Sequence, residues 1–181
     1  LAPTRIAQVR DLRFEYSPGR GDPRYIDDHS AFDVYLEFRT PRSGIGFVGI
    51  EMKYSEKLGG RPARHRARYD EVAAQMGCFK ARELVDLKAP PLEQIWRDHL
   101  LAGSLRIQDG FDDGFFALVY PSDNAYCARA VSRYRECLRD SDTFVGWHLE
   151  DIVASIQAHT DEVWIQEFFD RYLDFGKLRT E

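Results

Sequence analysis

The chain has 181 residues, of which 44% are hydrophobic and 30% are charged, and its formal net charge is −5 at pH 7. This length and composition predict a single domain over residues 1–181 with a buried core, and no apolar run is long enough to span a membrane. The acidic balance argues against a protein that coats nucleic acid without specificity, but it permits a local basic site.

The start of the chain suggests a processed or truncated product, and its cysteines suggest a cytoplasmic protein. The sequence begins with Leu1 rather than Met and carries no signal-peptide pattern. Cys78, Cys127 and Cys137 are an odd and scattered set, which favours reduced thiols over a disulfide framework.

The first third of the chain predicts strands. Residues 6–16 alternate partly, and residues 17–28 are rich in Gly, Pro and Asp, as loops are. Residues 31–39 and 47–54 alternate cleanly between apolar and polar side chains around the turn sequence TPRSGIG at 40–46. Two alternating strands joined by a short Gly-containing connection predict a β-hairpin.

The remainder predicts helices around two further strands. Helical spacing of apolar residues is expected from about 62 to 84, and again over 89–105, 122–140, 149–159 and 161–175. The continuous apolar run FFALVYP, residues 115–121, predicts a strand that is buried on both faces. Residues 143–149 predict a short strand, so the fold class is α/β with a central mixed sheet flanked by helices.

The hairpin carries the strongest chemical signal. If its turn centres near Arg42 or Ser43, Asp33 lies across from Glu51, and Lys53 follows one step along the same face, which we take to be the polar one. Directly opposed residues bring their Cβ atoms within about 4.5–5.5 Å. Two close carboxylates attract a divalent cation, and Mg²⁺ prefers a few carboxylates together with water and phosphate oxygens. A neighbouring ammonium group suits the charge of a phosphoryl transition state, although Glu and Lys also alternate on ordinary solvated strand faces.

The segment from about Tyr25 to Glu56 resembles the core of the PD-(D/E)-x-K nuclease superfamily. Asp33 matches the acidic residue of the first strand, and Glu51 and Lys53 match the acid–any–Lys pattern of the next. The segments QIWRDHLLA and FFALVYPSDN are similar to later parts of a bacterial branch of the superfamily. The resemblance implies a restriction-endonuclease-like αβββαβ core in which a helix upstream of Leu1 is absent or removed. It also implies Mg²⁺, with Mn²⁺ as a substitute, bound at Asp33, Glu51 and the backbone carbonyl of Met52, and Lys53 as the catalytic base or charge stabiliser.

Further residues near the hairpin are candidates for supporting roles. The stretch after Lys53 is basic, and its arginines are candidate phosphate ligands, with a solvated loop as the alternative; they are Arg61, Arg64, Arg66 and Arg68. Glu37 shares the face of Asp33, and Gln94 lies on a later helix. Either side chain could hold the metal-binding residues in place, or could instead lie at the surface.

The sequence therefore predicts a metal-dependent nuclease, most simply an endonuclease acting on DNA. The alternative is a non-catalytic module that binds nucleic acid or protein and retains the nuclease fold. The chain could also work as a homodimer or within a larger defence or repair assembly.

Overall fold

A five-stranded mixed sheet forms the centre of the molecule. The computed structural model describes residues 5–58 and 63–174. The strands are β1 (Gln8–Tyr16), β2 (Phe32–Arg39), β3 (Ile45–Met52), β4 (Asp113–Tyr120) and β5 (Phe144–His148), and they lie side by side in chain order. β1, β2 and β3 are antiparallel neighbours, whereas β3, β4 and β5 run parallel.

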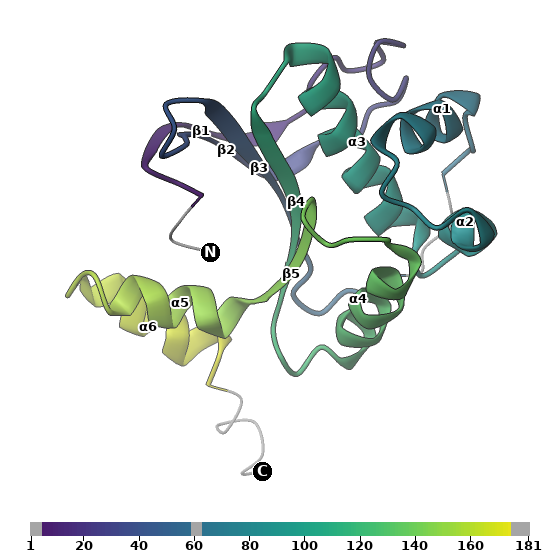
Figure 1. Cartoon of the computed structure of the whole chain (residues 1–181). Coiled ribbons are helices and arrows are strands. Elements are labelled where there is room, and N and C mark those ends of the chain that lie inside the picture. The colour runs from purple at the N-terminus through teal and green to yellow at the C-terminus, as the bar shows by residue number, and fades with distance from the viewer. Residues whose placement is uncertain (1–4, 59–62, 175–181) are drawn as a thin grey trace.

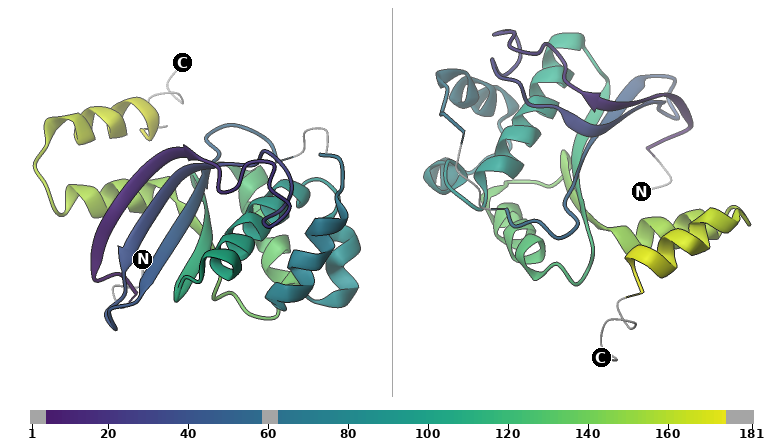
Figure 2. Two further views of the ribbon diagram at one scale, coloured as in Figure 1. Left: turned by 90° about the horizontal axis from the view of Figure 1, so that it is seen from above. Right: turned by 180° about the vertical axis from the view of Figure 1, so that it is seen from behind.

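Helices cover both faces of this sheet (Figures 1 and 2). On one face lie α1 (Ala67–Met76), the short α2 (Leu84–Leu87), α3 (Glu93–Asp109) and α4 (Ala125–Cys137). The other face carries the hairpin of α5 (Leu149–Gln157) and α6 (Val163–Tyr172). None of the helices in residues 5–58 and 63–174 has the length and apolarity that crossing a membrane requires.

The main core lies between the sheet and α3. Trp96, Leu100 and Leu105 of α3 are fully buried against Phe116 and Leu118 of β4. β4 is central, and from Gly114 onward every one of its residues is buried, which confirms the prediction of a strand covered on both faces. A parallel strand between two others needs apolar residues at every position, because helices cover both of its faces.

The predicted β2–β3 hairpin is confirmed. Its turn is closed by hydrogen bonds from the backbone N–H of Ser43 to the Thr40 carbonyl and from the N–H of Gly44 to Thr40 Oγ1, both 3.0 Å long. These bonds fix the register of the two long strands, because hairpin register follows from the turn.

The prediction of one helix over residues 62–84 is wrong. The helix ends at Met76 because Gly77 takes a left-handed conformation, with φ of 66°, and its N–H bonds back to the Ala73 carbonyl. Gly at this position is a common helix terminator. A 3₁₀ turn, Ala81–Glu83, and then α2 follow as separate elements.

Candidate active site

The carboxyl end of β3 brings together the three residues of the predicted site. The β2–β3 register pairs Tyr35 with Gly49 and Val34 with Ile50, so one further step sets Asp33 opposite Glu51. Asp33 Oδ2 accepts a hydrogen bond of 2.7 Å from the Met52 backbone N–H. Asp33 is therefore fixed against the end of β3 by its side chain.

The face that carries these residues is not the solvated face that the alternation suggested. Tyr35 and Phe47, which share it, are 2% and 0% exposed, and Glu51 itself is only 7% exposed. The reason is that α3 packs across this side of the sheet, and the alternation along a strand cannot show which face a distant helix will cover. The opposite face is covered less completely, so that Met52 is 40% exposed.

Phe32 and Gly49 set the position of Asp33. Phe32 is fully buried, and its ring fills the space in front of Gly49, where a Cβ atom would come within 2.5 Å of Phe32 Cε1. A larger residue at position 49 would push the ring aside and carry the adjoining Asp33 with it.

Glu51 is held by two polar neighbours. Lys53 Nζ forms an ion pair with Glu51 Oε1, and Gln94 Nε2 of α3 donates a hydrogen bond of 2.9 Å to the same oxygen. Burial raises the pKa of Glu51 above its ordinary value, and the charge of Asp33 adds to this, although Lys53 opposes it. Burial lowers the pKa of Lys53, but the hydrogen bond and charge of Glu51 outweigh it, so the net pKa is raised and the ammonium form is favoured.

A second layer of buried ionisable groups lies beneath the site on α3. Asp98 is 3% exposed, and burial, followed by the charge of Glu51, raises its pKa well above the ordinary value. Arg97 lies between carboxylates, with Nη1 3.5 Å from Glu93 Oε1 and Nε 3.9 Å from Asp28 Oδ2. The sequence reasoning missed Asp98, although it stands four residues after Gln94 and therefore on the same helical face.

The donor set suits a small divalent cation. The carboxylates of Asp33 and Glu51 lie opposite each other, and the Met52 carbonyl points to the β2 side of β3 together with the N–H that reaches Asp33, because both backbone groups of a strand residue face the same neighbour. Within the described ranges no group of three His, Cys, Asp or Glu side chains converges. Two carboxylates with a carbonyl match Mg²⁺, which retains several waters, and a cation would offset the unfavourable burial of Glu51.

The candidate basic residues have different surroundings. Arg66 pairs with Asp27 at 2.7 Å. Arg68 donates hydrogen bonds of 2.8 Å to the carbonyls of Arg24 and Tyr25, so it holds a loop against α1. Arg64 is exposed, and Arg61 lies outside the described residues.

The structure does not bring Glu37 to the site. Glu37 stands four residues from Asp33 along β2, about 13 Å away at the rise of a strand, and it pairs with Arg10 of β1 at 3.2 Å. Gln94, by contrast, reaches Glu51 directly.

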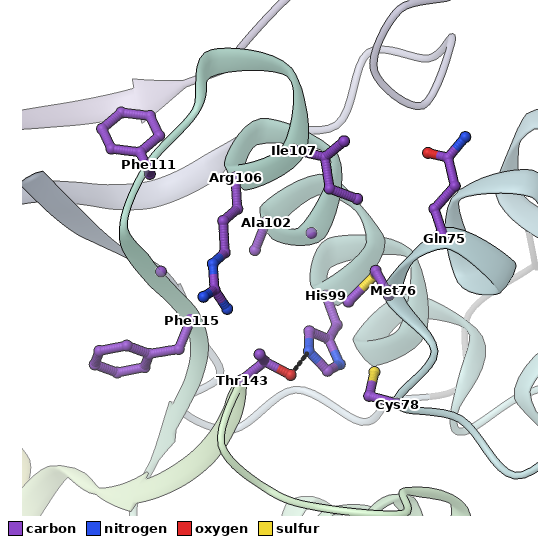
Figure 3. Close-up of a pocket in the computed structure, with 12 residues that line it drawn as sticks. Gln75, Met76, Cys78, His99, Ala102, Arg106, Ile107, Phe111, Phe115 and Thr143 are labelled. Atoms are coloured by element: carbon purple, nitrogen blue, oxygen red, sulfur yellow. Dashed lines mark hydrogen bonds between the residues drawn. The ribbon is translucent and has the colours of Figure 1, made fainter.

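A separate cavity of about 260 Å³ lies beside the far half of α3 (Figure 3). Ala102, in its wall, is two helical turns beyond Gln94, about 12 Å along the axis. His99 faces it and is hydrogen-bonded through both ring nitrogens, to Tyr134 Oη at 2.8 Å and Thr143 Oγ1 at 2.9 Å. Burial lowers the pKa of His99 to about 3, so this histidine is a neutral packing residue rather than a part of the site.

Comparison with known proteins agrees with this geometry. The family model of the PD-(D/E)XK nuclease superfamily matches residues 1–174, and the chain therefore belongs to that superfamily. Its mixed sheet with flanking helices is consistent with a restriction-endonuclease-like fold. Searches of curated proteins and of solved structures gave no match.

Proposed function

We propose that this member of the nuclease superfamily is a Mg²⁺-dependent endonuclease that hydrolyses phosphodiester bonds of DNA. One observation carries the proposal: Asp33 and Glu51 lie opposite each other at the end of β3, with Lys53 paired to Glu51. Outside a metal site, two carboxylates held together in a partly buried position would repel each other.

Each residue has a distinct role in this proposal. Asp33, Glu51 and the Met52 carbonyl hold the cation, which when bound supplies positive charge to the phosphate and lowers the pKa of a coordinated water. The Lys53 ammonium forms an ion pair with Glu51, which suits a role in stabilising charge or orienting water, and a role as a general base is the alternative. Gln94 holds the Glu51 carboxylate in place from behind.

Other residues indicate which side chain contacts the substrate and in which cellular setting the protein works. Arg64 remains a candidate phosphate ligand because it is exposed, whereas Arg66 and Arg68 already have protein partners. Cys78, Cys127 and Cys137 are buried free thiols, which supports a reducing, cytoplasmic setting.

The test is cleavage of plasmid, linear duplex and single-stranded DNA in Mg²⁺, Mn²⁺ or EDTA. We expect cleavage with either metal and none in EDTA. D33N and E51Q should abolish it, because each keeps the side-chain shape but removes a ligand charge, and K53A should slow it by about 10²–10³-fold. E37Q is the matched control, since Glu37 is a carboxylate of the same hairpin that lies away from the site.

The same experiment separates the alternative function. Binding of DNA without cleavage of any substrate in either metal would favour a non-catalytic module, or a subunit that depends on a partner. Cleavage that survives both D33N and E51Q would place the active site elsewhere and refute the proposal.

A further inference from the structure

Another cavity lies at the carboxyl ends of β3 and β4, between the connections that follow these strands. Its volume is about 300 Å³, and its lining comes from two connections. Tyr54 and Ser55 follow β3, one and two residues after Lys53, and Pro121, Asn124 and Tyr126 follow β4. The carboxyl ends of parallel strands are a frequent place for ligands, because the connecting loops diverge there.

Tyr126 stands at the edge of this cavity between two cations. Its side chain is half exposed, and its ring centroid lies 4.7 Å from Lys57 Nζ and 5.0 Å from Arg129 Cζ. We call Lys57, Tyr126 and Arg129 the Tyr126 cluster. Both cations of the cluster lie against the ring, so a phosphate beside a base at Tyr126 would meet positive charge.

Asn124 ties the Tyr126 cluster to the active site. Its side-chain amide donates to the carbonyls of Tyr54, at 3.2 Å, and Glu56, at 3.3 Å. Its Oδ1 caps α4 by accepting a bond of 3.1 Å from the Cys127 N–H. The first turn of α4, which carries Tyr126, is therefore fixed against the segment that follows Lys53.

The chemistry of the cavity suits a base rather than a phosphate. Asp123 also contributes to the lining, and an acidic wall disfavours an anion inside. Tyr54 also lines the cavity, and its hydroxyl donates a hydrogen bond of 2.6 Å to the Tyr172 carbonyl, which holds its ring in place. An aromatic surface with cations around it is the usual arrangement for single-stranded nucleic acid, in which the bases stack on rings and the phosphates meet the positive charges.

We propose that this cavity binds an unpaired nucleotide next to the scissile phosphate. Its base takes the place of Lys57 or Arg129 on the Tyr126 ring, and the two cations meet the backbone phosphates. The inference rests on the proposed nuclease function and deepens it, since it names single-stranded DNA, or duplex DNA with an unpaired segment, as the substrate. A base within an intact duplex is already stacked on both sides and cannot use the ring without being unstacked.

The experiment compares the affinity of the protein for single-stranded DNA with its affinity for duplex DNA. Affinities for a fluorescent single-stranded oligothymidine and for a matched hairpin duplex are measured by anisotropy, in Ca²⁺ and in EDTA. Y126A should weaken single-strand binding by about tenfold or more, because a base–ring stack contributes that much, and it should leave duplex binding unchanged. Y126W should restore the affinity, since any aromatic face can stack.

The controls make the result specific. W164A removes another exposed aromatic side chain, on the first turn of α6, and should change neither affinity. Tyr126 is exposed on a helix, so the fold of Y126A should persist, and a thermal melt checks this.

Each outcome decides a separate question. Equal loss of duplex and single-strand binding in Y126A, or no loss, would overturn the inference while leaving the nuclease proposal intact. Cleavage of intact duplex DNA as fast as single-stranded DNA would also overturn the inference and leave the nuclease proposal intact. If Y126A loses single-strand affinity selectively but the intact protein cuts nothing, the nucleotide site stands and the nuclease proposal fails.

Discussion

The protonation state of Asp98 can be tested through the pH dependence of stability. The ordinary pKa of an aspartate is 3.8, and burial raises the pKa of Asp98 well above it. Above about pH 4 the unfolded chain therefore loses a proton that the folded protein keeps. Stability falls as pH rises through this window by about 1.4 kcal/mol per pH unit, the value for a single proton.

The next residue, His99, has the opposite effect on how stability changes with pH. Its pKa falls from the ordinary 6.5 to about 3 on folding, so below pH 6.5 the unfolded state binds the extra proton. Stability then falls as pH decreases, again by about 1.4 kcal/mol per unit. From about pH 4 up to 6.5, or up to the folded pKa of Asp98 if that is lower, the two contributions oppose each other.

The variant D98N isolates the Asp98 contribution, because asparagine copies the neutral acid in shape. Urea unfolding is followed in EDTA at several pH values by tryptophan fluorescence, to which the buried Trp96 contributes. The unfolding free energy of D98N minus that of the intact protein should rise by about 1.4 kcal/mol per pH unit from about pH 4 upward. D161N, an exposed change before α6, is the matched control.

One result would refute this reasoning. If Asp98 is instead ionised and stabilised by Arg97, D98N would remove one of the three carboxylates around that buried arginine and leave Glu93 and Asp28. The variant would then lose stability, by up to about 3–5 kcal/mol, without gaining on the intact protein as pH rises.

Four other variants test the packing of the site, the bond of Gln94 to Glu51 and the two arginines that follow the hairpin. G49A should cost about 1–3 kcal/mol in a urea melt and reduce cleavage, because its Cβ collides with the Phe32 ring; unchanged stability would show that the ring moves freely. Q94A should weaken apparent Mg²⁺ affinity by about tenfold in a metal titration of the cleavage rate, and an unchanged titration would mean that its bond to Glu51 has no effect on the cation. R64A should lower the salt slope of duplex binding by about 0.9, whereas R68A should leave the slope unchanged and speed proteolysis of the loop at Arg24; the reverse pattern would exchange their roles.

The sequence by itself determined the hairpin and the proximity of the three proposed site residues. Period-two alternation on both sides of a short turn is a local property, and it fixes the register once the turn is placed. The proximity of Asp33, Glu51 and Lys53 could therefore be predicted from the sequence. β4 could be predicted for a similar reason, since a run that is apolar throughout suits only a strand with both faces covered.

Only the tertiary structure decided which face of the hairpin is buried and which side chains pack next to Glu51. The burial of Glu51 depends on α3, which begins more than forty residues later in the chain. The same holds for Gln94 and Asp98 beneath the site, and for Arg68, whose partners are backbone carbonyls in a distant loop. A local pattern records the geometry of one segment, whereas desolvation, pKa shifts and the cluster at Tyr126 arise from contacts between segments that only folding brings together.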